Sequence, residues 1–145
     1  RMKILMVCLG NICRSPLAQG IFEQLSKEFS IAVDSAGTAG YHIGSPPDPR
    51  SIKSALNHGI DISKQKARQF TRLDFDSFDH IFVMDLQNLK NVLELSQTEK
   101  ERGKVKLLLT NEEVEDPYYG DNQGFEIVYS KIEKACKEII DSWKQ

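Results

Sequence analysis

The segment KILMVCLGNICRSPLAQGIF, residues 3–22, decides the fold of this 145-residue chain. Its first six residues, 3–8, are continuously strand-favouring, which is typical of a strand buried on both faces of a parallel sheet. Gly10 ends this run, and the Ser15-Pro16 pair predicts the start of a helix with Ser15 as its N-cap. The segment therefore predicts a strand, a tight loop and a helix in direct succession.

The rest of the chain repeats this alternation of strand and helix. Hydrophobic patterning predicts further strands at 31–36, 80–84 and 105–109 and further helices at 50–58, 86–95 and 125–143. Between them lie a Gly/Pro-rich loop at 37–49, a turn-rich stretch up to residue 77 and an acidic loop at 111–124. This order predicts a single α/β domain over residues 1–145, with an open, doubly wound, four-stranded parallel sheet and helices on both faces. Ligands of such folds bind at the carboxyl ends of the strands.

The composition is that of an ordinary soluble protein, with 40% hydrophobic and 28% charged residues. A formal net charge of -2 gives no general attraction to nucleic acid or to an anionic membrane, so neither is expected as a partner. No apolar run approaches the roughly 20 residues of a membrane span, and the start of the sequence has no secretory pattern. Three cysteines without zinc-ligand spacing predict free thiols, a reducing cytoplasmic location and no metal site.

The loop CLGNICRS, residues 8–15, carries the chemistry. Successive backbone N–H groups in a tight turn, together with the start of a helix, form a concave site for a tetrahedral oxyanion. The planar guanidinium of Arg14 can bind two phosphate oxygens at once. A helix start and a nearby arginine also favour a thiolate over a thiol, and the Ser15 hydroxyl can donate a hydrogen bond to it. The loop therefore predicts attack of Cys8 on phosphorus.

This loop, followed by a proline, resembles the low-molecular-weight protein tyrosine phosphatase family. Five further stretches resemble the family in the same order: DSAG at 34–37, SPPDPR at 45–50, NHGI at 57–60, KARQ at 66–69 and EDPYYG at 115–120. The resemblance covers nearly the whole chain. It implies a cytoplasmic hydrolase that removes phosphate from phosphotyrosine through a cysteinyl-phosphate intermediate, with acid phosphatase activity and no cofactor. Phosphotyrosine proteins would be its substrates, phosphate-like anions its inhibitors, and a monomer its expected state.

The resemblance also assigns roles to single residues. It implies Cys8 as the nucleophile, Arg14 as the phosphate ligand and Asp116 as the acid that protonates the leaving tyrosyl oxygen and later acts as base. Physical reasoning agrees, because a tyrosinate leaving group benefits from a proton. The other phosphate-binding residues of the loop would be Leu9, Gly10, Asn11, Ile12, Cys13 and Ser15.

Aromatic side chains are expected to wall the substrate cleft. Tyr41 in the long loop and the Tyr118-Tyr119 pair beside the acid can supply those walls, and the family has a stacking aromatic residue at the position of Tyr41. Tyr118 and Tyr119 also resemble family sites of tyrosine phosphorylation.

Supporting residues are implied by the same resemblance. Asn11, Ser35 and His58 resemble a hydrogen-bond network that stiffens the phosphate loop, although His58 could instead interact with the carboxyl end of its own helix. Asp85 matches an acidic residue that the family pairs with the serine region of the phosphate loop. Cys13 could serve in packing, or it could trap oxidised Cys8 as a disulfide, as the resemblance suggests.

Three other functions are weighed against this interpretation. An arsenate reductase would need later resolving thiols, but the only cysteine after the loop is Cys136 on an amphipathic segment. A protein-arginine phosphatase carries threonine where Ile12 stands. A phosphopeptide-binding module gains nothing from the Cys8 thiol, and the Asp116 carboxylate would repel its ligand.

Overall fold

The computed structural model describes residues 1–144 and contains a parallel sheet of four strands in the order β2-β1-β3-β4. The strands are β1 (Met2–Cys8), β2 (Ile31–Gly37), β3 (His80–Val83) and β4 (Val105–Leu107). Every neighbouring pair is parallel, so all carboxyl ends lie at one edge of the sheet. The chain first moves from β1 to β2 and then crosses back to β3. This reversal places a crevice beyond the carboxyl end of β1.

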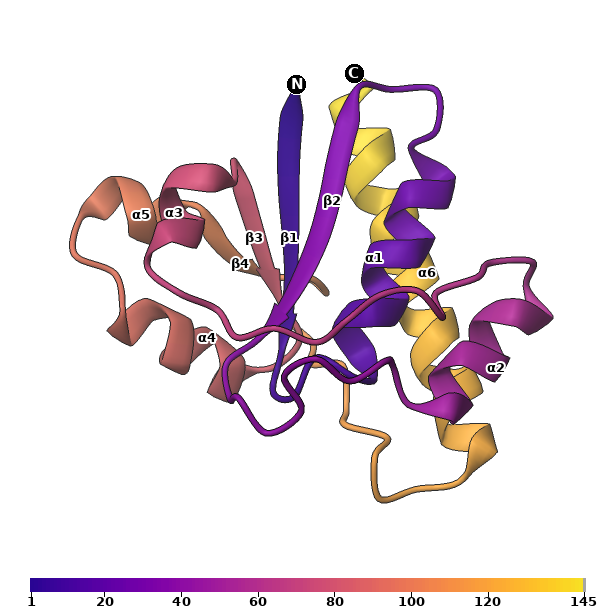
Figure 1. Ribbon diagram of the computed structural model, residues 1–145. Helices are drawn as coiled ribbons and strands as arrows, with labels where there is room; N and C mark the ends of the chain where they lie inside the picture. The colour runs from indigo at the N-terminus through magenta and orange to yellow at the C-terminus, as the bar shows by residue number, and fades with distance from the viewer. Residues whose placement is uncertain (145) are drawn as a thin grey trace.

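Helices cover both faces of the sheet (Figure 1). They are α1 (Arg14–Leu25), α2 (Pro49–Asn57), α3 (Leu73–Ser77), α4 (Leu86–Glu94), α5 (Glu99–Gly103) and α6 (Asn122–Trp143). Helices α1, α2 and α6 gather on one face, and α3, α4 and α5 lie on the other. The predicted doubly wound α/β fold is thereby confirmed.

Strand β1 is the centre of the core because it is buried on both faces. Ile4 and Met6 pack into a cluster with α1 and α6, whereas Leu5 and Val7 face the opposite cluster beneath α3 and α4. Such double burial explains why the strand reads as one continuous apolar run. Cys8, at the end of the same strand, is buried with the α1 and α6 cluster.

Some element bounds differ from the sequence predictions. Helices α3 and α5 have only five residues each, too few to produce a helical hydrophobic period, and they were not predicted. Helix α6 begins at Asn122 because the Asp121 carboxylate accepts a hydrogen bond from Gly124 N and caps the helix there.

The predicted cap of α1 is wrong. The N-cap is Cys13, which makes no side-chain capping bond, and Ser15 is already inside the helix. Ser15 does not cap because its hydroxyl is turned into the interior, 3.0 Å from the sulfur of Cys8.

Within residues 1–144, no helix is both long enough and apolar enough to cross a bilayer.

Candidate active site

The loop between β1 and α1 is held in its shape by Asn11. This residue has a φ of 58°, in the left-handed region that asparagine tolerates better than most residues. Its buried amide donates to Ser15 Oγ at 2.8 Å and to Ser35 Oγ at 3.0 Å, and its Oδ1 accepts from the backbone N of Arg68 at 3.0 Å. Three bonds therefore fix one strained residue, and the expected contact of Asn11 with Ser35 is present.

The Cys8 thiol lies at the base of this loop and is only 2% exposed. Its sulfur is 3.0 Å from Ser15 Oγ. Ser15 Oγ accepts a hydrogen bond from the Asn11 amide, so the Ser15 hydroxyl proton is free to be donated. The Cys8 sulfur is the nearer acceptor for that proton, because the alternative, Ala36 O, lies 3.4 Å away. A hydroxyl placed in this way stabilises negative charge on sulfur.

Arg14 is buried at the first position of α1 and is also only 2% exposed. Its Nη1 donates to Asp85 Oδ2 at 2.6 Å and to Val114 O at 2.9 Å. Its Nη2 lies 3.6 Å from Asp116 Oδ2. Burial lowers the pKa of Arg14, but Cys8, Asp85 and Asp116 outweigh burial and raise that pKa above its ordinary value. The guanidinium is therefore a fixed positive charge beside the thiol.

Asp85 has a different partner from the one predicted. It contacts Arg14 and not the serine region of the loop. The reason is its position as the N-cap of α4, where Oδ1 accepts from Asn88 N at 2.7 Å. Only Oδ2 remains to face the loop, and a carboxylate oxygen is drawn to a cation in preference to a neutral hydroxyl. Asp85 thus orients Arg14.

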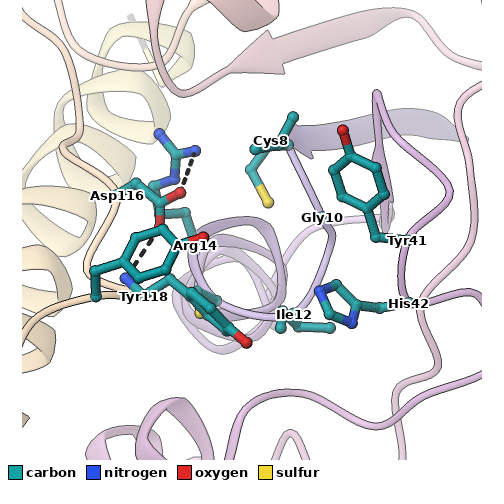
Figure 2. Close-up of a pocket in the computed structure, with 11 residues that line it drawn as sticks. Cys8, Gly10, Ile12, Arg14, Tyr41, His42, Asp116 and Tyr118 are labelled. Atoms are coloured by element: carbon teal, nitrogen blue, oxygen red, sulfur yellow. Dashed lines mark hydrogen bonds and ion pairs between the residues drawn. The ribbon is translucent and has the colours of Figure 1, made fainter.

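Asp116 lies at the mouth of the site, in the loop between β4 and α6. Its side chain is 37% exposed, and its Oδ1 accepts from Tyr118 N at 3.0 Å. The bond to Tyr118 and the neighbouring guanidinium of Arg14 direct its carboxylate toward the thiol side of the pocket (Figure 2).

These groups line one pocket of about 100 Å³. Figure 2 shows the sulfur of Cys8 in the middle, Tyr41 and His42 on one side, and Arg14, Asp116 and Tyr118 on the other. The full lining is Cys8, Leu9, Gly10, Ile12, Cys13, Arg14, Tyr41, His42, Asp116, Tyr118 and Tyr119. All three predicted substrate-binding tyrosines are therefore brought together. Of the predicted phosphate-binding residues, Asn11 and Ser15 do not line the pocket, and their side chains bond to each other instead.

His42 was assigned no function from the sequence, yet it lines the pocket. A methyl group added at Gly10 would come within 3.1 Å of His42 Cδ2, so this glycine permits the imidazole to lie against the loop. The ring centroid is 6.4 Å from that of Tyr41 and 6.3 Å from that of Tyr118. The one sequence signal for a role of His42 in the pocket was its position directly after Tyr41, in a loop without hydrophobic periodicity.

The predicted role of His58 in the loop network is wrong. Its ring stacks on Tyr129 with centroids 3.9 Å apart, and Nε2 lies 3.1 Å from Glu126 Oε2. His58 follows the last residue of α2, and α2 packs on α6, so the ring faces α6 and not the phosphate loop. Ser35 instead donates to Gln19 Oε1 at 2.8 Å.

The Glu126 cluster leads to a prediction about stability. Burial raises the pKa of Glu126, but hydrogen bonds from His58, Ser54 and Asn57 outweigh it and bring the pKa below its ordinary value of 4.5. The carboxylate therefore stabilises the fold above about pH 4.5, and this contribution is lost as the pH falls through the lowered folded-state pKa. Glu126→Gln should reduce the free energy of unfolding at pH 7 by less than about 1 kcal/mol, because the pair is half exposed.

Urea unfolding of wild type and Glu126→Gln at pH 7 and pH 3 measures this difference. Glu133→Gln is the control, because Glu133 on the same helix has only a 3.7 Å pair with Lys137. A difference between wild type and Glu126→Gln that was as large at pH 3 as at pH 7 would contradict the assignment.

Cys13 packs against Ile12, Ala67 and Phe125. Burial, followed by the charge of Asp48, raises the pKa of the Cys13 thiol to about 12, so it is protonated at neutral pH. The packing role is confirmed by these contacts, and capture of oxidised Cys8 stays a prediction.

Among residues 1–144, no three His, Cys, Asp or Glu side chains converge to form a metal site.

The structure thus brings a cysteine, an arginine and an anion-binding loop together at the end of the first strand of a doubly wound sheet. Residues 3–145 match the family model described as low molecular weight phosphotyrosine protein phosphatase. The chain belongs to that family.

Named relatives agree with this assignment. The chain is 41% identical to the low molecular weight phosphotyrosine protein phosphatase of Homo sapiens, over 95% of this chain and 93% of the relative. It is also 41% identical to a putative low molecular weight protein-tyrosine-phosphatase of Synechocystis, over 97% and 96%.

Solved structures share the fold. A protein tyrosine phosphatase from Entamoeba histolytica with Hepes in the active site superposes with a TM-score of 0.93 at 34% identity, covering 99% of this chain and 97% of that one. Vibrio vulnificus Wzb in complex with benzylphosphonate gives 0.90 at 28% identity, covering 97% and 98%.

Proposed function

We propose that this protein hydrolyses phosphotyrosine in proteins, and other aryl phosphates, through a cysteinyl-phosphate intermediate. The observation that carries the proposal is that Cys8, Arg14 and Asp116 line one pocket, with the guanidinium fixed beside the sulfur by Asp85. A binding module would need the arginine but neither the thiol nor the carboxyl.

In the first step the Cys8 sulfur attacks phosphorus. The S–P bond forms, the P–O bond to the tyrosyl group breaks, and the Asp116 carboxyl transfers its proton to the leaving oxygen. Arg14 and the N–H groups of the loop and the α1 start stabilise the charge on the three remaining oxygens. The side chain of the α1 N-cap, Cys13, makes no capping bond, so it does not compete with the phosphate for the N–H groups at the start of α1.

In the second step water attacks the phosphocysteine. The Asp116 carboxylate accepts a proton from the water, an O–P bond forms and the S–P bond breaks. Inorganic phosphate leaves and the Cys8 thiolate is restored. The Ser15 hydroxyl, 3.0 Å from the sulfur, stabilises that thiolate as it leaves.

The walls of the pocket favour an aryl ester over an alkyl one. Tyr41 on one side and Tyr118 on the other can contact both faces of a substrate ring (Figure 2). The benzylphosphonate bound by Wzb, an aromatic phosphonate, supports the same preference. Phosphoserine has no ring to fill this space.

We further propose that phosphate-like anions inhibit the enzyme, and that it acts in the cytoplasm as a monomer.

The first test is hydrolysis of p-nitrophenyl phosphate and of a phosphotyrosine peptide at mildly acid pH without added metal, with the matched phosphoserine peptide as control. Rapid acid quenching should trap phosphate on Cys8. We expect turnover of both aryl esters and a kcat/KM at least 100-fold lower for phosphoserine. A protein that bound phosphate but hydrolysed none of them would be a phosphate-binding module instead.

A further inference from the structure

We propose that Arg50, in the first turn of α2, is a positioning residue that holds the loop carrying Asp116 over the phosphate loop. The inference rests on the proposed function, because it concerns delivery of the Asp116 proton. Arg50 does not line the pocket, and its part in the reaction is to act through Asp116.

The guanidinium of Arg50 binds the Asp116 loop through its backbone. Nη2 donates to Tyr118 O at 2.8 Å, and Nη1 donates to Gly120 O at 2.9 Å. The same group lies over the Phe125 ring at 4.5 Å and near the Tyr118 ring at 5.7 Å. Two carbonyls and the Tyr118 ring therefore set where this segment lies relative to α2, and the Phe125 ring, on α6, supports the guanidinium itself.

Arg50 is in turn fixed to the phosphate loop by Asp48. Its Nε donates to Asp48 Oδ1 at 3.0 Å and its Nη2 to Asp48 Oδ2 at 2.9 Å, a two-point contact that sets the plane of the guanidinium. The backbone N of Asp48 donates to Ile12 O in the phosphate loop at 2.8 Å. A continuous chain of hydrogen bonds thus runs from the phosphate loop through Asp48 and Arg50 to Tyr118.

The Asp48–Arg50 contact is a strong one. The hydrogen bonds from Arg50 lower the pKa of Asp48, against burial, which raises it. Asp48 therefore remains ionised in the pH range in which an acid phosphatase works. Its charge keeps Arg50 in place over that range.

The Asp116 loop needs an external anchor because residues 111–121 contain no helix or strand. Arg14 binds the carbonyl of Val114, two residues before Asp116, and Arg50 binds the carbonyl of Tyr118, two residues after it. The acid is therefore held between two arginines. Lys131 pairs with Glu112 and Glu115, which come before the acid, and Arg14 also contacts the phosphate site itself. Arg50 is therefore the anchor of the residues after Asp116, and it can be removed without changing the phosphate site.

Loss of this anchor should affect substrates unequally. A misplacement of about 1 Å can lower a rate about 100-fold when the step depends on the misplaced group. p-Nitrophenolate leaves readily without a proton, whereas phenolate and tyrosinate do not. Removal of Arg50 should therefore slow cleavage of poor leaving groups and largely spare good ones.

The experiment measures kcat/KM of Arg50→Gln and Arg50→Lys on phenyl phosphate and on p-nitrophenyl phosphate. For Arg50→Gln we expect a loss of 30- to 100-fold on phenyl phosphate and of less than threefold on p-nitrophenyl phosphate. Arg50→Lys should fall between this variant and wild type, because an ammonium cannot bond two carbonyls and both Asp48 oxygens in one plane. The inhibition constant for inorganic phosphate should not change, because Arg14 and the phosphate loop remain intact.

Arg72→Gln is the matched control. Arg72 also joins a backbone carbonyl, Leu95 O at 3.0 Å, to a carboxylate, Glu101 at 3.2 Å, but it does so between the start of α3, the end of α4 and α5. Its kcat/KM should match wild type on both substrates.

Equal losses on both substrates, or no loss on either, would overturn the role of Arg50 while leaving the proposed function standing. If Arg50→Gln does not fold, the ratio of the two kcat/KM values in Arg50→Lys decides the question. Wild-type protein without activity on either ester would overturn the proposed function and this inference together.

Discussion

Replacing Cys8 with serine is expected to abolish turnover of aryl phosphates, with a loss of about four orders of magnitude or more in kcat. Serine nearly reproduces the shape of cysteine at this buried position, so the fold should remain. A hydroxyl is far less acidic than a thiol and supplies almost no anionic nucleophile at the pH of the reaction. Steady-state hydrolysis of p-nitrophenyl phosphate measures the loss, and acid quenching should trap no phosphoenzyme from the variant.

Two controls make the Cys8→Ser result specific. Cys136→Ala changes another buried cysteine, on α6 and remote from the pocket, and should keep the wild-type kcat for the fraction that is folded. Cys8→Ser should still bind inorganic phosphate, since Arg14 and the loop amides are unchanged. Substantial turnover by Cys8→Ser would show that the sulfur is not the attacking atom.

Replacing Asp116 with asparagine is expected to lower kcat/KM for phenyl phosphate and phosphotyrosine by 10²- to 10⁴-fold, the usual size of a general-acid contribution. The amide keeps the shape of the carboxyl but cannot give a proton to the leaving oxygen. The loss on p-nitrophenyl phosphate should be smaller.

Asp121→Asn is the control for Asp116→Asn, because Asp121 lies in the same loop and caps α6 without lining the pocket. It should leave kcat/KM unchanged. If Asp116→Asn retained the full rate on phenyl phosphate, another group would have to be the acid.

The fold could be predicted from the sequence because its signals are local and repeated. A strand buried on both faces, such as β1, has to be apolar along its length, and the amphipathic α6 has to show a helical period. The loop from Cys8 to Ser15 could be predicted for the same reason. The residues of this loop are adjacent in sequence, and the strand before it and the helix after it fix their relative positions.

Contacts between distant segments could not be predicted in the same way. The partner of Asp85 depends on the cap that it makes on α4, and the orientation of His58 depends on how α2 packs on α6. Both were assigned by resemblance, and both face neighbours that lie far from them in the sequence. The Ser15-Pro16 pair is typical of a helix cap, but in the structure the Ser15 hydroxyl faces the Cys8 sulfur, a contact between the two ends of the loop.

The burial of β1 on both faces also separates two properties that selection acts on. The thiol sits at the end of a strand whose successive side chains pack into two different core clusters, so that substitutions along the strand are costly to stability. The surrounding rim consists of loop side chains such as Tyr41, 75% exposed, and Tyr119, 93% exposed, whose replacement costs the fold little. Substrate preference can therefore drift among descendants of this protein while the chemistry at its base is inherited unchanged.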